Sequence, residues 1–288
     1  MVSQWRAFRG TPLTVDLNWP VIVASAGVVL VTYAVLIETW RQMVRAWGSE
    51  ISFPNAARIW SVSNLGRYVP GKIWSIGAMT TLAERTGVSP MAAAGSAILN
   101  TIVNIATGFL VALVAGWKSF DVLSKGHTGL GAGLLILAIG GVMLLPTLMP
   151  RILDLARRLT GRELAIAAIP HRAVYLSLAG NIVAWLLYGA AFKLFVHGVI
   201  GTAPGSFADY VTAWAWPYVL GYLVLVAPGG IGVRDGALAL ALTALGIATP
   251  PQAALIMVTS RLWLTVLELL PGLTYMAIGG RPQPKPNR

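Results

Sequence analysis

The chain has 288 residues, of which 56% are hydrophobic and only 11% are charged, and its mean hydropathy is +0.72. Soluble domains carry about 25% charged residues, so this chain has too little polar surface for a water-soluble protein of its size. Lys and Arg number 21 against 10 Asp and Glu, and no cysteine is present. In so apolar a chain, the positive excess indicates cytoplasmic loops beside anionic lipid, or an anionic ligand, rather than nucleic acid. The three scattered histidines and the lack of cysteine predict neither a metal site nor a cofactor.

Five apolar stretches approach or exceed the roughly 18–20 residues that a membrane-spanning helix needs. In chain order they cover 20–37, 91–116, 129–149, 173–200 and 253–279. Tryptophans near their ends, Trp40 and Trp214 among them, are expected to form an interfacial belt. The sequence therefore predicts an all-α, polytopic integral membrane protein of the plasma (cytoplasmic) membrane, with a single transmembrane domain over residues 1–288.

Two further apolar stretches, 53–82 and 207–245, are interrupted by Pro-Gly breaks. The breaks are Pro70-Gly71, followed by Lys72, and Pro228-Gly229-Gly230. Proline removes a helical hydrogen-bond donor and glycine loosens the backbone, and such a break is tolerated at membrane depth only inside protein or beside water. We therefore expect each stretch to form a re-entrant helical hairpin with its tip at the break.

The two hairpins begin two similar segments, repeat one (about 53–116) and repeat two (about 207–279). The landmarks of repeat one are Pro70-Gly71, Gly87-Val88, Ala92-Ala93 and Asn100. Those of repeat two are Pro228-Gly229, Gly246-Ile247, Ala253-Ala254 and Arg261, which lie 158 to 161 residues later. Chance could produce such common residue pairs, but the conserved spacing favours two inverted repeats, a recurring plan among transporters.

The distribution of positive charge predicts which side each loop faces. If hairpin one enters from the cytoplasm and hairpin two from outside, the inner loops hold 12 basic residues and the outer loops hold 4. The inner set is Arg41, Arg45, Arg58, Arg85, Arg151, Arg157, Arg158, Arg162, Arg172, Arg281, Lys285 and Arg288. This topology places the N-terminus outside.

Charged side chains cluster around the two breaks, within the predicted membrane segments. They are Arg67, Lys72, Arg234, Asp235, Arg261 and Glu268. An arginine at the bilayer centre costs roughly 2.5–3.5 kcal/mol on insertion scales, and only two acidic groups are present to offset four basic ones. Either internal salt bridges and snorkelling accommodate these charges, or they line a wet cavity that accepts an anion. Asp235, rather than Glu268 two turns further along the same helix, is the expected partner of Arg261.

Residues 66–72 also resemble the start of a phosphate-binding P-loop. Ile73, however, stands where Ser or Thr must reach the magnesium ion, and Pro70 removes one backbone N–H from the cradle. We therefore expect no ATP site.

Several of these motifs together resemble the lysylphosphatidylglycerol synthase transmembrane (flippase-like) family over roughly residues 30–280. The first-half motifs are Trp40-Arg41, Trp47-Gly48, Arg67-Tyr68-Val69-Pro70-Gly71 and Gly87-Val88. The second, sharper signature is the run from Pro228 to Gly236, followed by Gly246-Ile247 and Ser260-Arg261-Leu262. The resemblance implies a protein that moves phospholipid or glycolipid across a bilayer. The family positions that carry over are Pro70, Gly71, Pro228, Gly229, Gly230, Arg234, Asp235 and Arg261.

The chain departs from the family pattern at several points. Asp235 replaces the commoner Glu, and Asn100 stands where many members have Arg. The usual first transmembrane helix is expected to be missing from residues 1–19, and no soluble aminoacyl-transferase domain follows Arg288, so we expect the chain not to be a complete synthase.

We predict a lipid flippase or scramblase, not an enzyme, that moves an anionic or aminoacylated phospholipid or a glycolipid. Arg67 and Lys72 would meet the phosphate from the cytoplasmic half, and Arg234 and Arg261 from the outer half. Asp235 and Glu268 would hold those last two arginines or bind an amino headgroup. The alternatives are a membrane enzyme or subunit acting on a lipid-linked substrate, and a non-transporting assembly partner. The expected partners are the lipid, the membrane, and a second copy or a separate lipid-modifying enzyme, with no nucleic acid.

Overall fold

The computed structural model describes residues 17–68, 73–117, 140–141, 144, 147, 151, 170–223 and 232–279. Every regular element in these ranges is a helix, which confirms the predicted all-α class. The predicted hairpin tips lie outside the described residues, as does most of the predicted span 129–149. The site residues affected are Pro70, Gly71, Lys72, Pro228, Gly229 and Gly230.

Four long helices correspond to four of the five predicted spans: α2 (Trp19–Ala46), α5 (Pro90–Ala115), α8 (His171–Ile200) and α11 (Pro250–Gly279). Each is long and apolar enough to cross a membrane. The first helix continues past its predicted end at residue 37 because Glu38 and Arg41 neutralise each other through an ion pair of 2.7 Å. Beyond that pair, α2 buries Trp40, Met43 and Val44.

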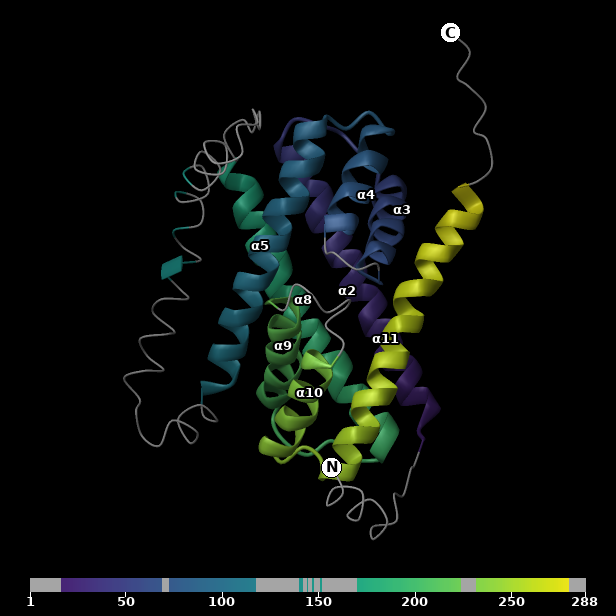
Figure 1. Ribbon diagram of the computed structural model, residues 1–288, viewed down its shortest axis with the longest axis vertical. Coiled ribbons are helices and arrows are strands. Elements are labelled where there is room, and N and C mark those ends of the chain that lie inside the picture. The colour runs from purple at the N-terminus through teal and green to yellow at the C-terminus, as the bar shows by residue number, and fades with distance from the viewer. Residues whose placement is uncertain are drawn as a thin grey trace.

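Four shorter helices fall where the hairpin arms were predicted: α3 (Phe53–Asn64), which continues as the 3-10 helix η1 (Leu65–Tyr68), α4 (Ile73–Glu84), α9 (Phe207–Leu223) and α10 (Val233–Ala244). With 12 residues each, α3, α4 and α10 are shorter than a membrane span. The helices pack in consecutive pairs, α3 against α4 and α9 against α10. The first pair lies at one end of the molecule and the second pair at the opposite end (Figure 1).

The turns that lead from the short helices into α5 and α11 have the same design. Gly87 and Gly246 both adopt positive φ angles, 89° and 67°, which glycine reaches without strain. The residue after each glycine donates its backbone N–H back into the preceding helix, Val88 to Ala83 at 3.2 Å and Ile247 to Leu242 at 2.9 Å. The two predicted landmarks therefore share one local conformation.

Among the described helices, the most extensive contact joins α2 and α8, which pack along each other (Figure 1). Glycines of α8 allow this close approach, because a Cβ at Gly180 would lie 2.0 Å from Thr39 Oγ1 and one at Gly198 would lie 2.6 Å from Ile22 Cγ1. Around this pair, α5 packs against α8 and α9, and α11 packs against α3 and α10. Of the four long helices, α5 contacts α4 and α9, and α11 contacts α3 and α10, so these two link short helices from both ends of the molecule.

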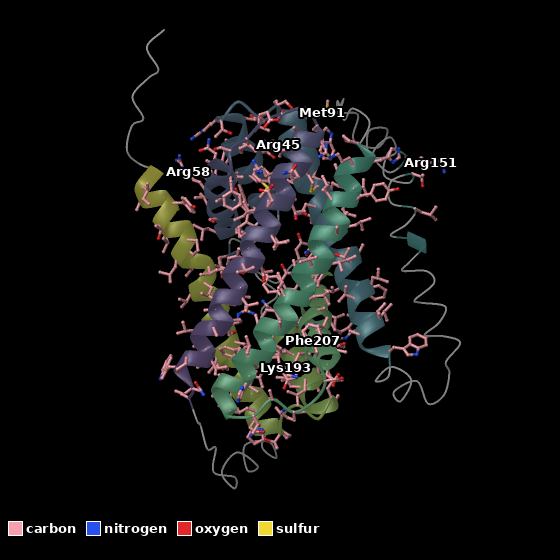
Figure 2. The ribbon with its side chains drawn as sticks, turned by 180° about the vertical axis from the view of Figure 1, so that it is seen from behind. Arg45, Arg58, Met91, Arg151, Lys193 and Phe207 are labelled. Carbon is pink, nitrogen blue, oxygen red and sulfur yellow. The ribbon has the colours of Figure 1, made fainter. Side chains whose placement is uncertain are left out.

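Basic residues that were assigned to the inner loops gather at one end of the molecule. Arg45, Arg58 and Arg151 lie at the end that carries α3 and α4, whereas Lys193 and Phe207 lie towards the other end (Figure 2). This grouping agrees with the charge pattern used to assign topology. The side of the membrane on which this end lies stays a prediction.

Candidate functional site

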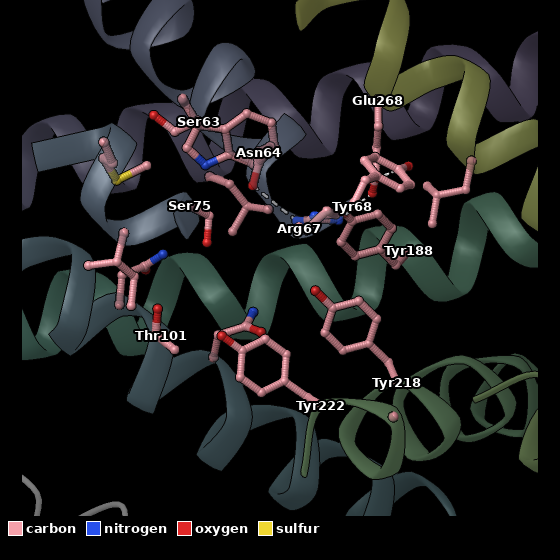
Figure 3. A pocket seen from close by; sticks show the side chains of 18 of the residues that line it. Ser63, Asn64, Arg67, Tyr68, Ser75, Thr101, Tyr188, Tyr218, Tyr222 and Glu268 are labelled. Carbon is pink, nitrogen blue, oxygen red and sulfur yellow. Dashed lines mark hydrogen bonds and ion pairs between the residues drawn. The ribbon is translucent and has the colours of Figure 1, made fainter. Parts of the chain in front are cut away.

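A cavity of about 190 Å³ lies between the two sets of helices. Its wall includes residues from α2, α3, η1, α4, α5, α8, α9, α10 and α11. Of the five predicted site residues that the structure describes, four line it: Arg67, Arg234, Arg261 and Glu268. Figure 3 shows the polar and aromatic side chains that surround this space. Charges separated by up to 201 positions in the sequence therefore meet at one place.

Arg67 and Glu268 form an ion pair that joins η1 to α11. The same carboxylate accepts a hydrogen bond of 2.6 Å from the hydroxyl of Tyr68, and Arg67 also donates to Asn64 Oδ1 at 3.0 Å (Figure 3). The Glu268 side chain is only 8% exposed, so Arg67 compensates a largely desolvated charge. Glu268 was predicted to hold Arg234 or Arg261, or to bind an amino headgroup. The structure pairs it with Arg67 instead of those two arginines, because α11 packs against α3 and brings Glu268 to η1.

Arg261 and Asp235 form a second ion pair, with 2.7 Å between Nη1 and Oδ1, which joins α11 to α10. The predicted partnership is confirmed. Asp235 lies in the first turn of α10, and its second oxygen accepts the backbone N–H of Gly232 at 3.1 Å. A carboxylate at a helix N-terminus is favoured by the helix dipole, so Asp235 has two reasons to stay ionised and in place.

Arg234 is held by aromatic rings instead of a carboxylate. Its guanidinium carbon lies 5.0 Å from the ring centroid of Trp214 and 5.4 Å from that of Tyr218, both on α9. Gly221 makes room for it, because a Cβ there would lie 2.8 Å from Arg234 Cβ. Within the described ranges, Arg234 makes no ion pair. Cation–π contacts orient a guanidinium without neutralising it, so its charge stays available to an anion.

The site carries one positive charge in excess among the residues that the structure describes. Arg67 is balanced by Glu268 and Arg261 by Asp235, whereas Arg234 is not balanced. Internal salt bridges therefore accommodate two of the arginines, as one of the two predicted explanations has it, and the third contributes a net positive charge to the cavity. That the cavity accepts an anion stays a prediction.

A ladder of neutral polar side chains forms another part of the wall, between α5 and α8. Asn104 Nδ2 donates to Asn181 Oδ1 at 2.7 Å, and Asn181 Nδ2 donates to Asn100 Oδ1 at 3.0 Å. Ser177 Oγ lies 3.3 Å from the same oxygen of Asn100. Asn100 and Asn104 line the cavity, whereas Asn181 and Ser177 are fully buried behind them.

Sequence reasoning missed this ladder and the aromatic cradle of Arg234. The ladder had a signal, since Asn100 and Asn104 are four residues apart in an apolar helix and therefore lie on one helical face. The cradle had none, because Trp214 was expected at the membrane interface. Trp214 is 3% exposed and Trp40 is fully buried, so the predicted belt is wrong at both positions: Trp214 packs beneath Arg234, and Trp40 donates to Ser96 Oγ at 2.9 Å.

Four apolar helices of spanning length, arranged around an internal charged cavity, define an integral membrane protein. The chain belongs to the lysylphosphatidylglycerol synthase transmembrane region family, whose model matches residues 3–272. This match confirms the resemblance drawn from the sequence motifs and places the protein in membrane lipid biology. No curated protein matches the chain significantly.

Proposed function

We propose that this protein is a lipid flippase or scramblase of the plasma membrane, and that the cavity receives the phosphate of an anionic lipid. The observation that carries the proposal is Arg234, a cation within a cavity of a membrane protein whose two neighbouring arginines already have acidic partners. Arginine binds phosphate through paired N–H donors, and the surrounding low dielectric strengthens the attraction. The acyl chains would remain in the bilayer while the headgroup crosses.

The arrangement of helices supports two inverted repeats with re-entrant hairpins as the machinery. Helices α4 and α10 have equal lengths and start 160 residues apart, as do the starts of α5 and α11. The contacts between helices also correspond, because the long helix of each half packs against the first short helix of the other: α5 against α9, and α11 against α3. In this proposal, rocking of one half against the other opens the cavity to each leaflet in turn.

The mechanism assigns a different task to each arginine. Arg234 provides the resting positive charge that attracts the phosphate. Arg67 and Arg261 reach the phosphate as second and third donors while Glu268 and Asp235 keep them in position. Because Arg67–Glu268 joins the two halves, a phosphate that competes for Arg67 would weaken that link and favour rocking.

Reconstitution in liposomes tests the proposal directly. Acyl-labelled phospholipid is placed in both leaflets, and the fraction that becomes accessible to an impermeant quencher is followed over time. Arg234→Gln should slow flipping of anionic phospholipid by about tenfold or more, because it removes a charge-assisted contact with the phosphate. Lys193→Gln is the matched control, since Lys193 lies 5.5 Å from the ring of Tyr210 but does not line the cavity.

Each outcome has a defined meaning. Slow flipping by the Arg234 variant and normal flipping by the Lys193 variant support the proposal. If the Arg234 variant moves lipid at the unaltered rate, the phosphate does not bind there. If the unaltered protein moves no phospholipid, the proposal is overturned in favour of an enzyme subunit or an assembly partner.

A further inference from the structure

The cavity also carries information about the headgroup beyond the phosphate, if the proposed function holds. We infer that the site selects phospholipids whose headgroup is neutral and rich in hydroxyls, such as a glycerol or a sugar, over aminoacylated or other amine-bearing lipids. The inference rests on three observations: the carboxylates are already paired with arginines, the rings around Arg234 are already occupied, and neutral polar side chains line part of the cavity.

An ammonium headgroup needs an anion, and the carboxylates at the site are already neutralised. Glu268 is bound by Arg67 and Tyr68, and Asp235 by Arg261 and the start of α10. Releasing either carboxylate for a headgroup would leave an arginine unbalanced beside Arg234, in a poorly solvated cavity. The net positive charge of the described site also repels a cationic headgroup.

Aromatic faces are the other surfaces that bind ammonium groups, and the rings around Arg234 already have other neighbours. The rings of Trp214 and Tyr218 lie beside the guanidinium of Arg234. Tyr188, which lines the cavity, stacks on Trp214 with an interplanar angle of 28° and also contacts Trp185. The cradle is therefore already used by a protein cation.

The neutral wall offers donors and acceptors together, which is what a hydroxyl group requires. Ser63 is 1% exposed, and its Oγ makes no hydrogen bond within the described part of the chain; the same holds for Asn64 Nδ2. The ladder engages Asn100 through its oxygen and Asn104 through its nitrogen, which leaves an amide N–H₂ and an amide oxygen on the cavity side. All four residues line the cavity, and Figure 3 shows Asn64 beside Arg67, with Ser63 further from it.

The experiment compares three acyl-labelled lipids in the same liposome assay: phosphatidylglycerol, phosphatidylethanolamine and lysylphosphatidylglycerol. We expect phosphatidylglycerol to flip about tenfold faster than the two amine-bearing lipids, a ratio that one charge-assisted contact can produce. Faster flipping of lysylphosphatidylglycerol overturns the inference but leaves the proposed function intact. Failure of all three lipids to flip overturns the proposed function itself.

Two variants test whether the wall sets this selectivity. Asn64→Asp keeps the oxygen that accepts from Arg67 and replaces the unpartnered amide with a negative oxygen. It should shift the rate ratio towards the amine-bearing lipids by about tenfold, since it cancels the excess positive charge of the described site, which repels a cationic headgroup. An unchanged ratio would show that Asn64 does not face the headgroup and would overturn the assignment of this wall.

Ser63→Ala removes a buried hydroxyl that has no hydrogen-bond partner among the described residues, so the described fold loses no hydrogen bond. Phosphatidylglycerol flipping should fall by about threefold to tenfold, the effect of one hydrogen bond, with no loss of thermal stability. Ser96→Ala is the matched control, because Ser96 is a fully buried serine that accepts from Trp40 at 2.9 Å and does not line the cavity. It should lower stability and leave the lipid ratio unchanged; the opposite pattern for the two serines would contradict the inference.

Discussion

The two halves of the bundle use corresponding positions in different ways. In the second half, Asp235 on α10 and Arg261 on α11 form an ion pair. The corresponding positions of the first half, 160 and 161 residues earlier, are Ser75 on α4 and Asn100 on α5, which carry no charge. Asn100 instead joins the ladder to α8. At these corresponding positions the second half therefore provides an ion pair, whereas the first half provides neutral polar side chains and contributes its charge through Arg67 on η1.

The largest expected effect is in cysteine labelling, because a residue on one side of the membrane is either accessible to an impermeant reagent or not. Phe53 and Phe207 begin α3 and α9 and are both exposed. If the halves are inverted, Phe53→Cys should react with an impermeant thiol reagent only from the cytoplasmic side, and Phe207→Cys only from the outer side. The chain has no cysteine of its own, so the unaltered protein is the blank. Labelling of both positions from the same side would break the inverted arrangement.

Removal of one partner of the Arg261–Asp235 ion pair should have the next largest effect, a loss of stability. Arg261→Ala leaves Asp235 without its guanidinium, and we expect the free energy of unfolding to fall by about 2 kcal/mol. This is less than the loss for a fully buried pair, because the two side chains are 27% and 20% exposed. Chemical denaturation in detergent measures the change.

The double variant Arg261→Ala/Asp235→Ala should recover part of this loss but not all of it, because Asp235 also caps α10. Flipping distinguishes the structural role of Arg261 from binding. If the recovered double variant flips lipid at the full rate, Arg261 does not contact the phosphate.

Substitution of Gly221 tests how strongly the position of the Arg234 side chain depends on close packing against α9. In Gly221→Ala the new Cβ would lie 2.8 Å from Arg234 Cβ, so we expect a loss of about 1–2 kcal/mol and slower flipping as the guanidinium leaves its rings. Gly77→Ala is the control in the other half, since nothing lies within 4 Å of the new Cβ on α4. It should raise stability by about 0.5–1 kcal/mol, because alanine favours the helix. Equal effects at both glycines would show that α9 does not pack closely on Arg234.

The predictable and unpredictable parts of the site differ in how far apart their residues lie. Hydropathy alone located four described spans, and Arg261–Asp235 was predictable because both residues belong to one repeat. The ion pair Arg67–Glu268 forms because α11 of one half packs against α3 of the other. Its two residues are 201 positions apart in the sequence, so no local sequence pattern could predict the contact. Trp214 lies beneath Arg234 because α9 packs against α10 within the second half, where end-of-span position alone predicted an interfacial side chain.

The smallest effect concerns the link between the halves. Tyr68→Phe removes the hydroxyl that donates to Glu268 at 2.6 Å and leaves the ion pair with Arg67 in place. A hydrogen bond to a charged group contributes about 1.5–3 kcal/mol, and exposure of Tyr68 lowers the expected loss to about 1 kcal/mol. Tyr175→Phe is the control, because Tyr175 is an exposed tyrosine on α8 that does not line the cavity, and it should change the free energy of unfolding by less than about 0.5 kcal/mol. If flipping depends on separating η1 from α11, the Tyr68 variant should flip lipid faster despite its lower stability. An unchanged or slower rate would mean that this contact does not limit the opening of the cavity.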